Sequence, residues 1–294
     1  LPPGHPSNPG RSRPRDLNPS PGDKAESAHA DRRSEHPDRQ PDAPNRDYWR
    51  EVPRFLNAWV DHLRRWPAQT VVAAIDRSHD PIGSWRGDGD QYLRPEQHVQ
   101  AKDVIKMVQF RERALTGKME KAAERNSCNG RLVGLEFRIK GEDRLKEKIA
   151  EKIEHEPDRT PAEAAREIND AIRYTFCFEP DKYVRGYGEI KQRLEASEYR
   201  MIYCKNHWRD DPEYKGINTR WVTQEGQRFE VQFHTAESFH AKQEVTHGAY
   251  ERSRNRLTER SERREVEAYQ RDVCTFVDVP IDVESITDYK EEGI

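Results

Sequence analysis

The segment from Phe229 to Thr235 alternates between apolar and polar side chains. In a β-strand, every second side chain points to the same face. The apolar face would carry Phe229, Val231 and Phe233, and the polar face Glu230, Gln232 and His234. A carboxylate, an amide and an imidazole on one face could bind a polar substrate, with Glu230 as the base that accepts a proton. An ordinary half-solvated strand fits the same alternation equally well.

A second strand is predicted just upstream, over residues 217–224, with Glu225 and Gly226 as a two-residue hairpin turn. Counting back from that turn pairs Trp221 with Glu230, Thr219 with Gln232, and Ile217 with His234. This register would place the ring of Trp221 beside the Glu230 carboxylate, on the polar face of the sheet.

Basic residues gather just before and within the next predicted helix upstream, at Arg138, Lys140, Arg144 and Lys148. The first two are two apart in an extended segment and the last two are four apart in a helix, so each pair would face one way. Guanidinium and ammonium groups arranged in this way can hold a triphosphate without a glycine-rich loop. A solvated helix face is the alternative, because Glu142, Glu147 and Glu151 are interspersed.

Asp170 stands between a predicted helix and a predicted strand. A carboxylate at the start of a strand is well placed to hold Mg²⁺ against phosphate oxygens. An aspartate that only ends a helix or forms a turn would occupy the same position.

The elements that position these residues follow from spacing and capping. Leu145, Ile149 and Ile153 recur at every fourth position, which predicts a helix. The run from Thr160 to Glu163 is a capping box with proline at the first helical position, so another helix starts there. Further helices are predicted over 52–66, 99–124, 180–194 and 238–254, and further strands over 132–139, 174–178 and 199–203. This order predicts an α+β fold, a mixed β-sheet flanked by helices with an antiparallel hairpin at its centre.

Residues 1–45 contain ten of the nineteen prolines and no aromatic residue. A segment with so little to bury is predicted to be a disordered Pro-rich tail or linker. We therefore expect a helical extension over residues 46–125 and the α+β domain over residues 126–290. The first residue is Leu, which fits a piece of a longer, exported protein.

The composition excludes several classes of protein. Basic and acidic side chains nearly cancel, at 51 and 54, so no broad cationic field is available for gripping nucleic acid. The four cysteines are widely spaced, which argues against a zinc ribbon or a disulfide scaffold. No apolar stretch is long enough to cross a membrane. The chain also lacks a P-loop, a GxGxxG motif and a nucleophile elbow, so any phosphate chemistry must depend on side chains.

Taken in order, these groups resemble the synthetase domain of the RelA/SpoT family, the alarmone synthetases and their small toxic relatives. The resemblance covers residues from about 130 to 255. The matching segments are Arg138-Ile-Lys140 with Lys148, Asp170-Ala-Ile-Arg173-Tyr-Thr175, Lys205-Asn206-His207, Lys215-Gly216-Ile217-Asn218-Thr219 and Glu230-Val-Gln-Phe-His-Thr235. The five segments occur in the order and at the spacing of the family's motifs.

The resemblance implies a pyrophosphokinase that transfers the β,γ-pyrophosphate of ATP to the 3′-hydroxyl of a ribose and acts in the cytoplasm. Arg138 would then lie near the ATP base, while Lys140, Lys148, Arg144 and Lys205 would bind the donor nucleotide. Asp170 would bind Mg²⁺, and Glu230 would activate the acceptor hydroxyl and assist with the metal. A toxic relative would also have an immunity protein or antitoxin as its partner; the resemblance gives no oligomeric state.

The chain departs from the family pattern on the acceptor side. Ile217 stands where the family has a stacking Tyr, and His234 stands where it has an Arg. We expect Tyr214 or Trp221 to supply a ring instead, with Gln232 and His234 completing the acceptor site. An adenine nucleotide is therefore expected as acceptor in preference to a guanine nucleotide, with the 3′ end of tRNA as the alternative. A module that binds nucleotide or RNA without catalysis is the rival from another class.

Overall fold

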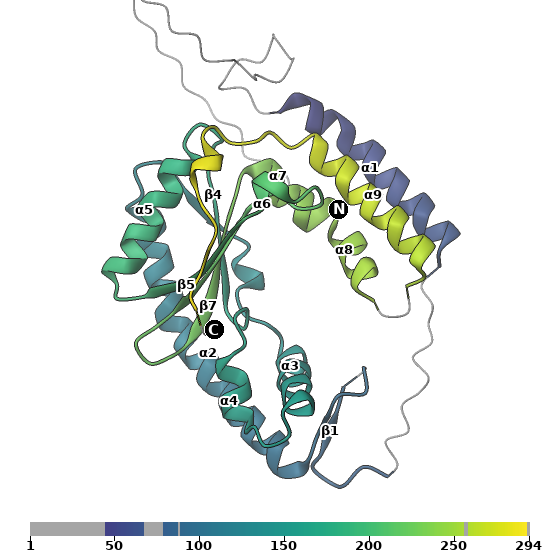
Figure 1. The fold of residues 1–294 in the computed structure, drawn as a ribbon, viewed down its shortest axis with the longest axis vertical. Coiled ribbons are helices and arrows are strands. Elements are labelled where there is room, and N and C mark those ends of the chain that lie inside the picture. Colours follow the sequence, from purple (N-terminus) through teal and green to yellow (C-terminus); the bar gives the residue numbers. More distant parts are fainter. Residues whose placement is uncertain (1–44, 68–78, 88, 256–257, 293–294) are drawn as a thin grey trace, which may run out of the picture. The chain divides into compact units, whose positions relative to one another are not determined.

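A six-stranded mixed sheet forms the centre of the fold in the computed structural model (Figure 1). The strand order is β3–β4–β7–β6–β5–β8, in which β4 and β7 are parallel and every other neighbouring pair is antiparallel. The strands are β3 (Arg131–Val133), β4 (Arg173–Cys177), β5 (Arg200–Asn206), β6 (Ile217–Val222), β7 (Arg228–His234) and β8 (Tyr289–Lys290). A separate small hairpin pairs β1 (Trp85–Arg86) with β2 (Tyr92–Leu93).

The structure describes residues 45–67, 79–87, 89–255 and 258–292. The predicted tail over residues 1–45 lies outside these ranges except for Asn45, whose side chain caps the first helix. The longer helices are α1 (Arg46–Arg65), α2 (Pro95–Glu124), α3 (Glu142–His155), α5 (Tyr183–Ala196) and α9 (Arg260–Thr275). The shorter ones are α4 (Pro161–Arg166), α6 (His207–Asp210), α7 (Ala236–His240), α8 (His247–Arg254), two 3₁₀ turns, η1 (Leu135–Phe137) and η3 (Val283–Ser285), and the π-helix η2 (Ala241–Val245). The predicted α+β class, with a mixed sheet flanked by helices, is confirmed.

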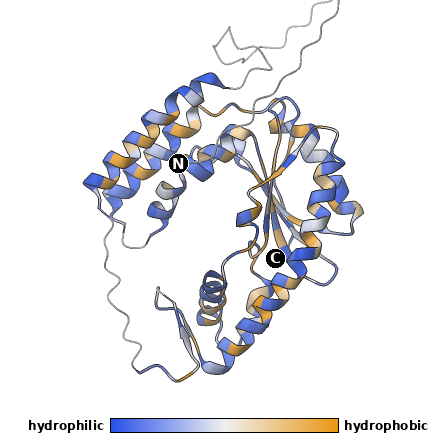
Figure 2. Ribbon diagram, turned by 180° about the vertical axis from the view of Figure 1, so that it is seen from behind, coloured by the Kyte–Doolittle hydropathy of each residue, from blue (hydrophilic) through white to orange (hydrophobic). Residues whose placement is uncertain are grey.

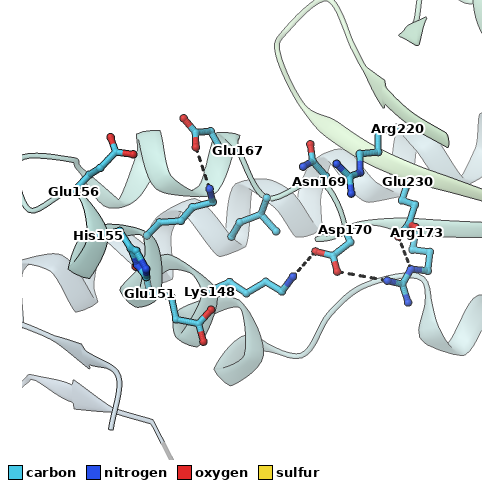
Figure 3. Close-up of a pocket in the computed structure, with 12 residues that line it drawn as sticks. Lys148, Glu151, His155, Glu156, Glu167, Asn169, Asp170, Arg173, Arg220 and Glu230 are labelled. Carbon is cyan, nitrogen blue, oxygen red and sulfur yellow. Dashed lines mark hydrogen bonds and ion pairs between the residues drawn. The ribbon is translucent and has the colours of Figure 1, made fainter. Parts of the chain in front are cut away.

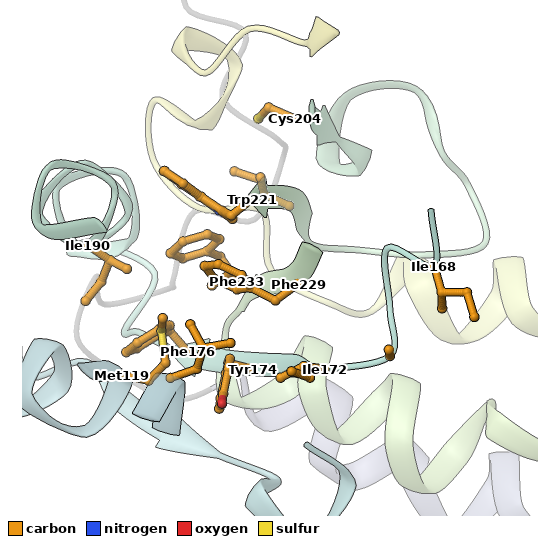
Figure 4. Packing of buried hydrophobic residues seen from close by; sticks show 14 of the residues in the cluster. Met119, Ile168, Ile172, Tyr174, Phe176, Ile190, Cys204, Trp221, Phe229 and Phe233 are labelled. Atoms are coloured by element: carbon orange, nitrogen blue, oxygen red, sulfur yellow. The ribbon is translucent and has the colours of Figure 1, made fainter. Parts of the chain in front are cut away.

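One face of the sheet is apolar and is covered by α2 and α5 (Figure 4). Side chains from alternate positions of the central strands, among them Tyr174, Phe176, Phe229 and Phe233, are buried against Met119 and Ile190 from these helices. Because α2 contributes to the same buried cluster as the sheet, the predicted boundary at residue 125 does not separate two bodies. All described residues belong to one compact unit.

The central hairpin differs from the prediction by one residue. Thr223 N–H bonds to the Gln227 carbonyl, so the loop contains three residues rather than two, with Gly226 at a φ of +80°. A three-residue loop with glycine in the left-handed region is a common hairpin form. The extra residue shifts the register, so that Glu230 pairs with Arg220 and Trp221 pairs with Phe229. A shift of one residue exchanges the two faces of a strand.

A second layer is built from α1 and α9, which lie side by side in Figure 1. Tyr269 on α9 donates a hydrogen bond to the Phe55 carbonyl of α1, and Arg54 pairs with Asp272. Both helices carry hydrophilic and hydrophobic segments in Figure 2, as expected for amphipathic helices. The prediction included α1 but missed α9. No helix in the described ranges combines the length and apolarity of a membrane span.

Candidate functional site

The second face of the sheet carries polar side chains in a row across four strands. Register pairing aligns Arg173 of β4 with Glu230 of β7, then with Arg220 of β6 and Tyr203 of β5. Paired residues in neighbouring strands project to the same face of a sheet. Glu230 therefore has a guanidinium on either side of it, and the predicted alternation of polar and apolar positions in β7 is correct.

Asp170 lies in the short connection between α4 and β4, where the capped helix ends and the strand begins. Three cations surround its carboxylate, with Lys148 Nζ at 2.8 Å, Lys140 Nζ at 3.2 Å and Arg173 Nη2 at 3.4 Å. Burial alone would raise the pKa of Asp170, but Lys140 and Lys148 outweigh it and lower this pKa to about 2. Asp170 is thus an anionic group at the centre of a cationic cluster.

Arg173 links the two predicted acidic residues. Its Nε donates to Glu230 Oε2 at 2.7 Å, and its Nη2 lies 3.4 Å from Asp170 Oδ2 (Figure 3). The guanidinium therefore holds both carboxylates on one side of the sheet. Sequence reasoning noted Arg173 within the Asp170 motif but gave it no role, although its position three residues after Asp170 was the available signal.

Lys242 is the second residue that the sequence did not reveal. It projects from the π-helix η2 and donates to Gln232 Oε1, while Gln232 Nε2 donates to Glu230 Oε1 at 3.0 Å. Burial, followed by the nearby charge of Arg173, lowers the pKa of Lys242 from 10.5 to about 8. π-Helical turns occur often at functional sites, and here the turn aims an ammonium at the network that orients Glu230.

We expect Lys242→Met to change how stability depends on pH. Because the folded pKa is about 8 and the ordinary value is 10.5, the unfolded wild-type chain binds more protons between these pH values. Wild-type stability then rises with pH in that window, and the variant lacks this contribution. The difference in unfolding free energy, wild type minus variant, should increase by about 1–3 kcal/mol across the window.

Urea denaturation of wild type and Lys242→Met, at pH values of about 7, 8.5 and 10, measures this difference. Lys191→Met is the control, because Lys191 on α5 forms an ordinary helix-surface pair with Glu195. Parallel pH curves for wild type and Lys242→Met would mean that the ammonium is solvated in the folded chain.

A cavity of about 510 Å³ opens between α3, α4 and the polar face of the sheet (Figure 3). Lys148 and Asp170 line it together with Arg173, Arg220 and Glu230. Its volume is that of a site for a ligand the size of a nucleotide. Of the predicted site residues, the cavity brings Asp170, Glu230 and Lys148 together, and Lys140 joins them through Asp170.

Three predicted donor-binding residues lie away from this cluster. Arg138 donates to Glu112 Oε1 of α2 at 2.7 Å, Arg144 is exposed and pairs with Glu147, and Lys205 pairs with Asp288 beside β8. The expectation that Arg138 and Lys140 face one way is wrong. Arg138 closes the 3₁₀ turn η1 with helical backbone angles (φ −66°, ψ −21°), so it is not extended, and its side chain contacts Glu112 whereas Lys140 contacts Asp170.

Two predicted acceptor-binding residues are in the core. Trp221 and Ile217 are both 0% exposed and lie on the apolar face, so neither contacts the polar face of the sheet. The three-residue hairpin loop is the cause, since it puts Arg220 where Trp221 was expected.

The remaining acceptor candidates do meet on the polar side. The Tyr214 hydroxyl donates to Asn218 Oδ1 and lies 2.9 Å from His234 Nε2, while His234 Nδ1 lies 2.9 Å from Ser238 Oγ. Complete burial lowers the pKa of His234 well below its ordinary value, so the imidazole is neutral. His234 therefore positions Tyr214 rather than carrying charge.

The two carboxylates also bear on metal binding. Within the described ranges, no three or more Asp, Glu, His or Cys residues form a group that could hold a metal ion. Mg²⁺, however, is often held by only one or two carboxylates together with substrate phosphates. Asp170 and Glu230, which share Arg173 as a partner, fit an ion that enters with a nucleotide.

The fold and site together define an α+β protein with a cationic, carboxylate-bearing cavity on a mixed sheet. No protein-family model matches the chain, and no curated protein matches it. Among solved structures, similarity is found to the Type VI effector Tas1 in complex with its immunity protein, with 18% identity and a TM-score of 0.40 over 59% of this chain and 95% of that chain.

Two further structures are similar to the chain. A GTP pyrophosphokinase family protein from Streptococcus pneumoniae has 16% identity and a TM-score of 0.40, over 62% of this chain and 90% of that one. The small alarmone synthetase 2 from Bacillus subtilis has 13% identity and a TM-score of 0.41, over 60% and 92%.

Proposed function

We propose that the chain is an ATP-dependent pyrophosphokinase that transfers the β,γ-pyrophosphate of ATP to a ribose 3′-hydroxyl of a nucleotide. The observation that carries the proposal is the single cavity wall on which Asp170, Arg173 and Glu230 are joined, with Lys140 and Lys148 on the Asp170 side. Cations for a polyphosphate, a carboxylate for a metal and a second carboxylate for a proton are the groups this reaction needs.

The transfer balances with the groups present. The acceptor 3′-oxygen attacks the β-phosphorus of ATP and forms the new O–P bond, while the bond from that phosphorus to the α,β-bridging oxygen breaks. AMP leaves with the bridging oxygen, and the hydroxyl proton passes to Glu230. Mg²⁺ held by Asp170 and Glu230 would offset charge on the transferred phosphates.

In this scheme Arg173 and Gln232 orient Glu230. Each contacts a different oxygen of its carboxylate, at 2.7 and 3.0 Å. Two fixed donors leave the carboxylate few alternative rotamers, so its orientation at the wall of the cavity is held. A base held in this way needs little reorganisation when the acceptor hydroxyl arrives.

The proposal is tested with purified protein, γ-labelled ATP, Mg²⁺ and a panel of acceptors. Transfer of label with release of one AMP per product supports the kinase, whereas binding without turnover supports the non-catalytic module. Adenine nucleotides, guanine nucleotides and tRNA compete at one donor concentration. A preference for guanine nucleotides of more than about tenfold would contradict the expected adenine acceptor.

Lys140→Ala and Lys148→Ala should each weaken ATP binding by roughly 1–3 kcal/mol, the usual effect of losing a charge-assisted contact. Both ammonium groups lie within 3.2 Å of Asp170, and within the described ranges neither forms an ion pair with another carboxylate. Calorimetric titration with ATP measures the affinity, and Lys191→Ala on α5 serves as the control. Equal ATP affinity in all variants would mean that these lysines form only a solvated basic patch and do not bind the donor.

A protein partner that blocks the cavity, an immunity protein or antitoxin, is part of the same proposal. It depends on the likeness of the motifs to those of toxic family members. Co-purification with a candidate inhibitor and loss of label transfer in the complex would test it.

A further inference from the structure

We infer that Arg220, stacked on Tyr203, is the binding group for the phosphate on the 5′ side of the acceptor ribose. The inference rests on the proposed function and adds to it the chemical class of the acceptor. That class is a ribonucleotide with a 5′-phosphate, either as a free nucleotide or as the 3′-terminal residue of an RNA.

The position of Arg220 comes from the register of the sheet. Across the row of Arg173, Glu230, Arg220 and Tyr203, Glu230 lies between the two guanidinium groups. The cations that hold Asp170 lie on the β4 side of Glu230, and Arg220 lies on the β6 side. Figure 3 shows Arg220 beside Glu230, at the wall of the cavity that Asp170 and Lys148 also line.

Arg220 is also the cation of this cavity that is least committed to carboxylates. Lys148 pairs with Asp170, Lys152 with Glu167, and Arg173 with both Asp170 and Glu230. Within the described ranges, the Arg220 guanidinium has no hydrogen bond or ion pair to a side chain; its contact is with the Tyr203 ring, 4.3 Å from the ring centroid.

A stacked guanidinium is suited to binding phosphate. Stacking uses the flat face of the group and fixes its plane, while its N–H edges stay available for a bidentate contact with two phosphate oxygens. An anion at this position does not have to displace a carboxylate, in contrast to the cluster around Asp170.

The order of groups assigns Arg220 to the acceptor rather than to the donor. In the proposed transfer, the acceptor hydroxyl meets Glu230 while the donor phosphates lie against Lys140 and Lys148. We place the remainder of the acceptor on the β6 side of Glu230, where Arg220 lies, because the cations assigned to the donor are on the β4 side. The hairpin register thus replaces the expected aromatic contact at this place with a charged one, so that the acceptor phosphate is recognised there instead of its base.

The test compares adenosine, AMP, ADP and a short RNA ending in CCA as acceptors, with wild type, Arg220→Met and Arg220→Lys. Wild type should use ADP at least about tenfold better in kcat/KM than adenosine, which lacks the anion. In Arg220→Met, most of this advantage of ADP should be lost. Its kcat/KM with adenosine as acceptor should stay within about twofold of the wild-type value, and its KM for ATP as donor should be unchanged. Arg220→Lys should recover part of it, because the charge returns without the fork.

Arg113→Met, at an exposed position of α2, is the matched control and should resemble wild type. If kcat/KM falls in Arg220→Met with ADP but not with the RNA, the phosphate bound by Arg220 belongs to a free nucleotide. If it falls with the RNA but not with ADP, the phosphate belongs to an RNA end. An equal loss with every acceptor, or a change confined to the KM of the donor, would overturn the inference.

Equilibrium binding separates this inference from the proposed function. AMP affinity is measured by calorimetry in wild type and Arg220→Met, with a non-transferable ATP analogue present. Weaker AMP binding in the variant, in a protein that shows no transfer, would keep the phosphate site while the kinase proposal fails. Unchanged AMP affinity in a protein that transfers pyrophosphate would overturn the site alone.

Discussion

Glu230→Gln is expected to lower pyrophosphate transfer by at least about 10²–10³-fold while the fold stays intact. The amide keeps the size of the side chain and an oxygen that can accept from Arg173, but it cannot take the proton of the acceptor hydroxyl. The side chain is 10% exposed and held by Arg173 and Gln232, so the substitution should leave the packing of the sheet unchanged.

Steady-state kinetics with saturating ATP and acceptor measure the effect, and thermal unfolding checks the fold. Glu189→Gln is the control, because Glu189 is also a hydrogen-bonded carboxylate but lies on α5, where it accepts from Ser127. Turnover equal to wild type in Glu230→Gln would remove this residue from the mechanism, and the polar face of β7 would then serve binding only.

Asp170→Asn should abolish Mg²⁺-dependent transfer, leaving activity at background. It should also lower stability at neutral pH by about 2 kcal/mol, because the pKa of Asp170 is about 2 in the folded chain and 3.8 ordinarily. A carboxyl group whose folded pKa is depressed stabilises the protein above its ordinary pKa. This contribution disappears as the pH falls from about 4 to about 2.

Two measurements therefore bear on Asp170. Mg²⁺ titration of nucleotide binding reports on the metal, and denaturant unfolding at pH values from about 2.5 to 7 reports on the ion pairs. The stability difference between wild type and variant should shrink as the pH falls through that window. A variant that retains Mg²⁺-dependent turnover, whatever its stability, would contradict the assignment of the metal to Asp170.

Local signals in the sequence were sufficient for most elements of the fold. Thr160 and Glu163 form the predicted capping box, and α4 starts at Pro161. Leu145, Ile149 and Ile153 are buried on α3 as their spacing predicted. These predictions succeed because capping and amphipathic spacing depend on residues within one or two turns of each other.

The errors arise where one residue changes the phase of a whole element. The extra residue in the loop at Gly226 moved Trp221 from the polar face to the core, although both strands were predicted. The π-helix η2 likewise departs from the 3.6-residue period, so regular helical spacing could not predict the contact between Lys242 and Gln232. The contact of Arg173 with Glu230 depends on the parallel pairing of β4 with β7, and periodicity within a strand does not specify which strands pair.

That parallel pairing also bears on how the protein folds. Arg173 and Glu230 are 57 positions apart in the chain, and α5, β5, α6 and β6 lie between their strands. Contacts between distant residues form slowly because a long loop must close first. We therefore expect the pairing of β4 with β7, which brings Arg173 to Glu230, to be a slow and late step of folding. Under the proposed function, a chain in which β4 and β7 have not yet paired would lack the joined Arg173 and Glu230, so pyrophosphate transfer should appear only after the sheet has closed.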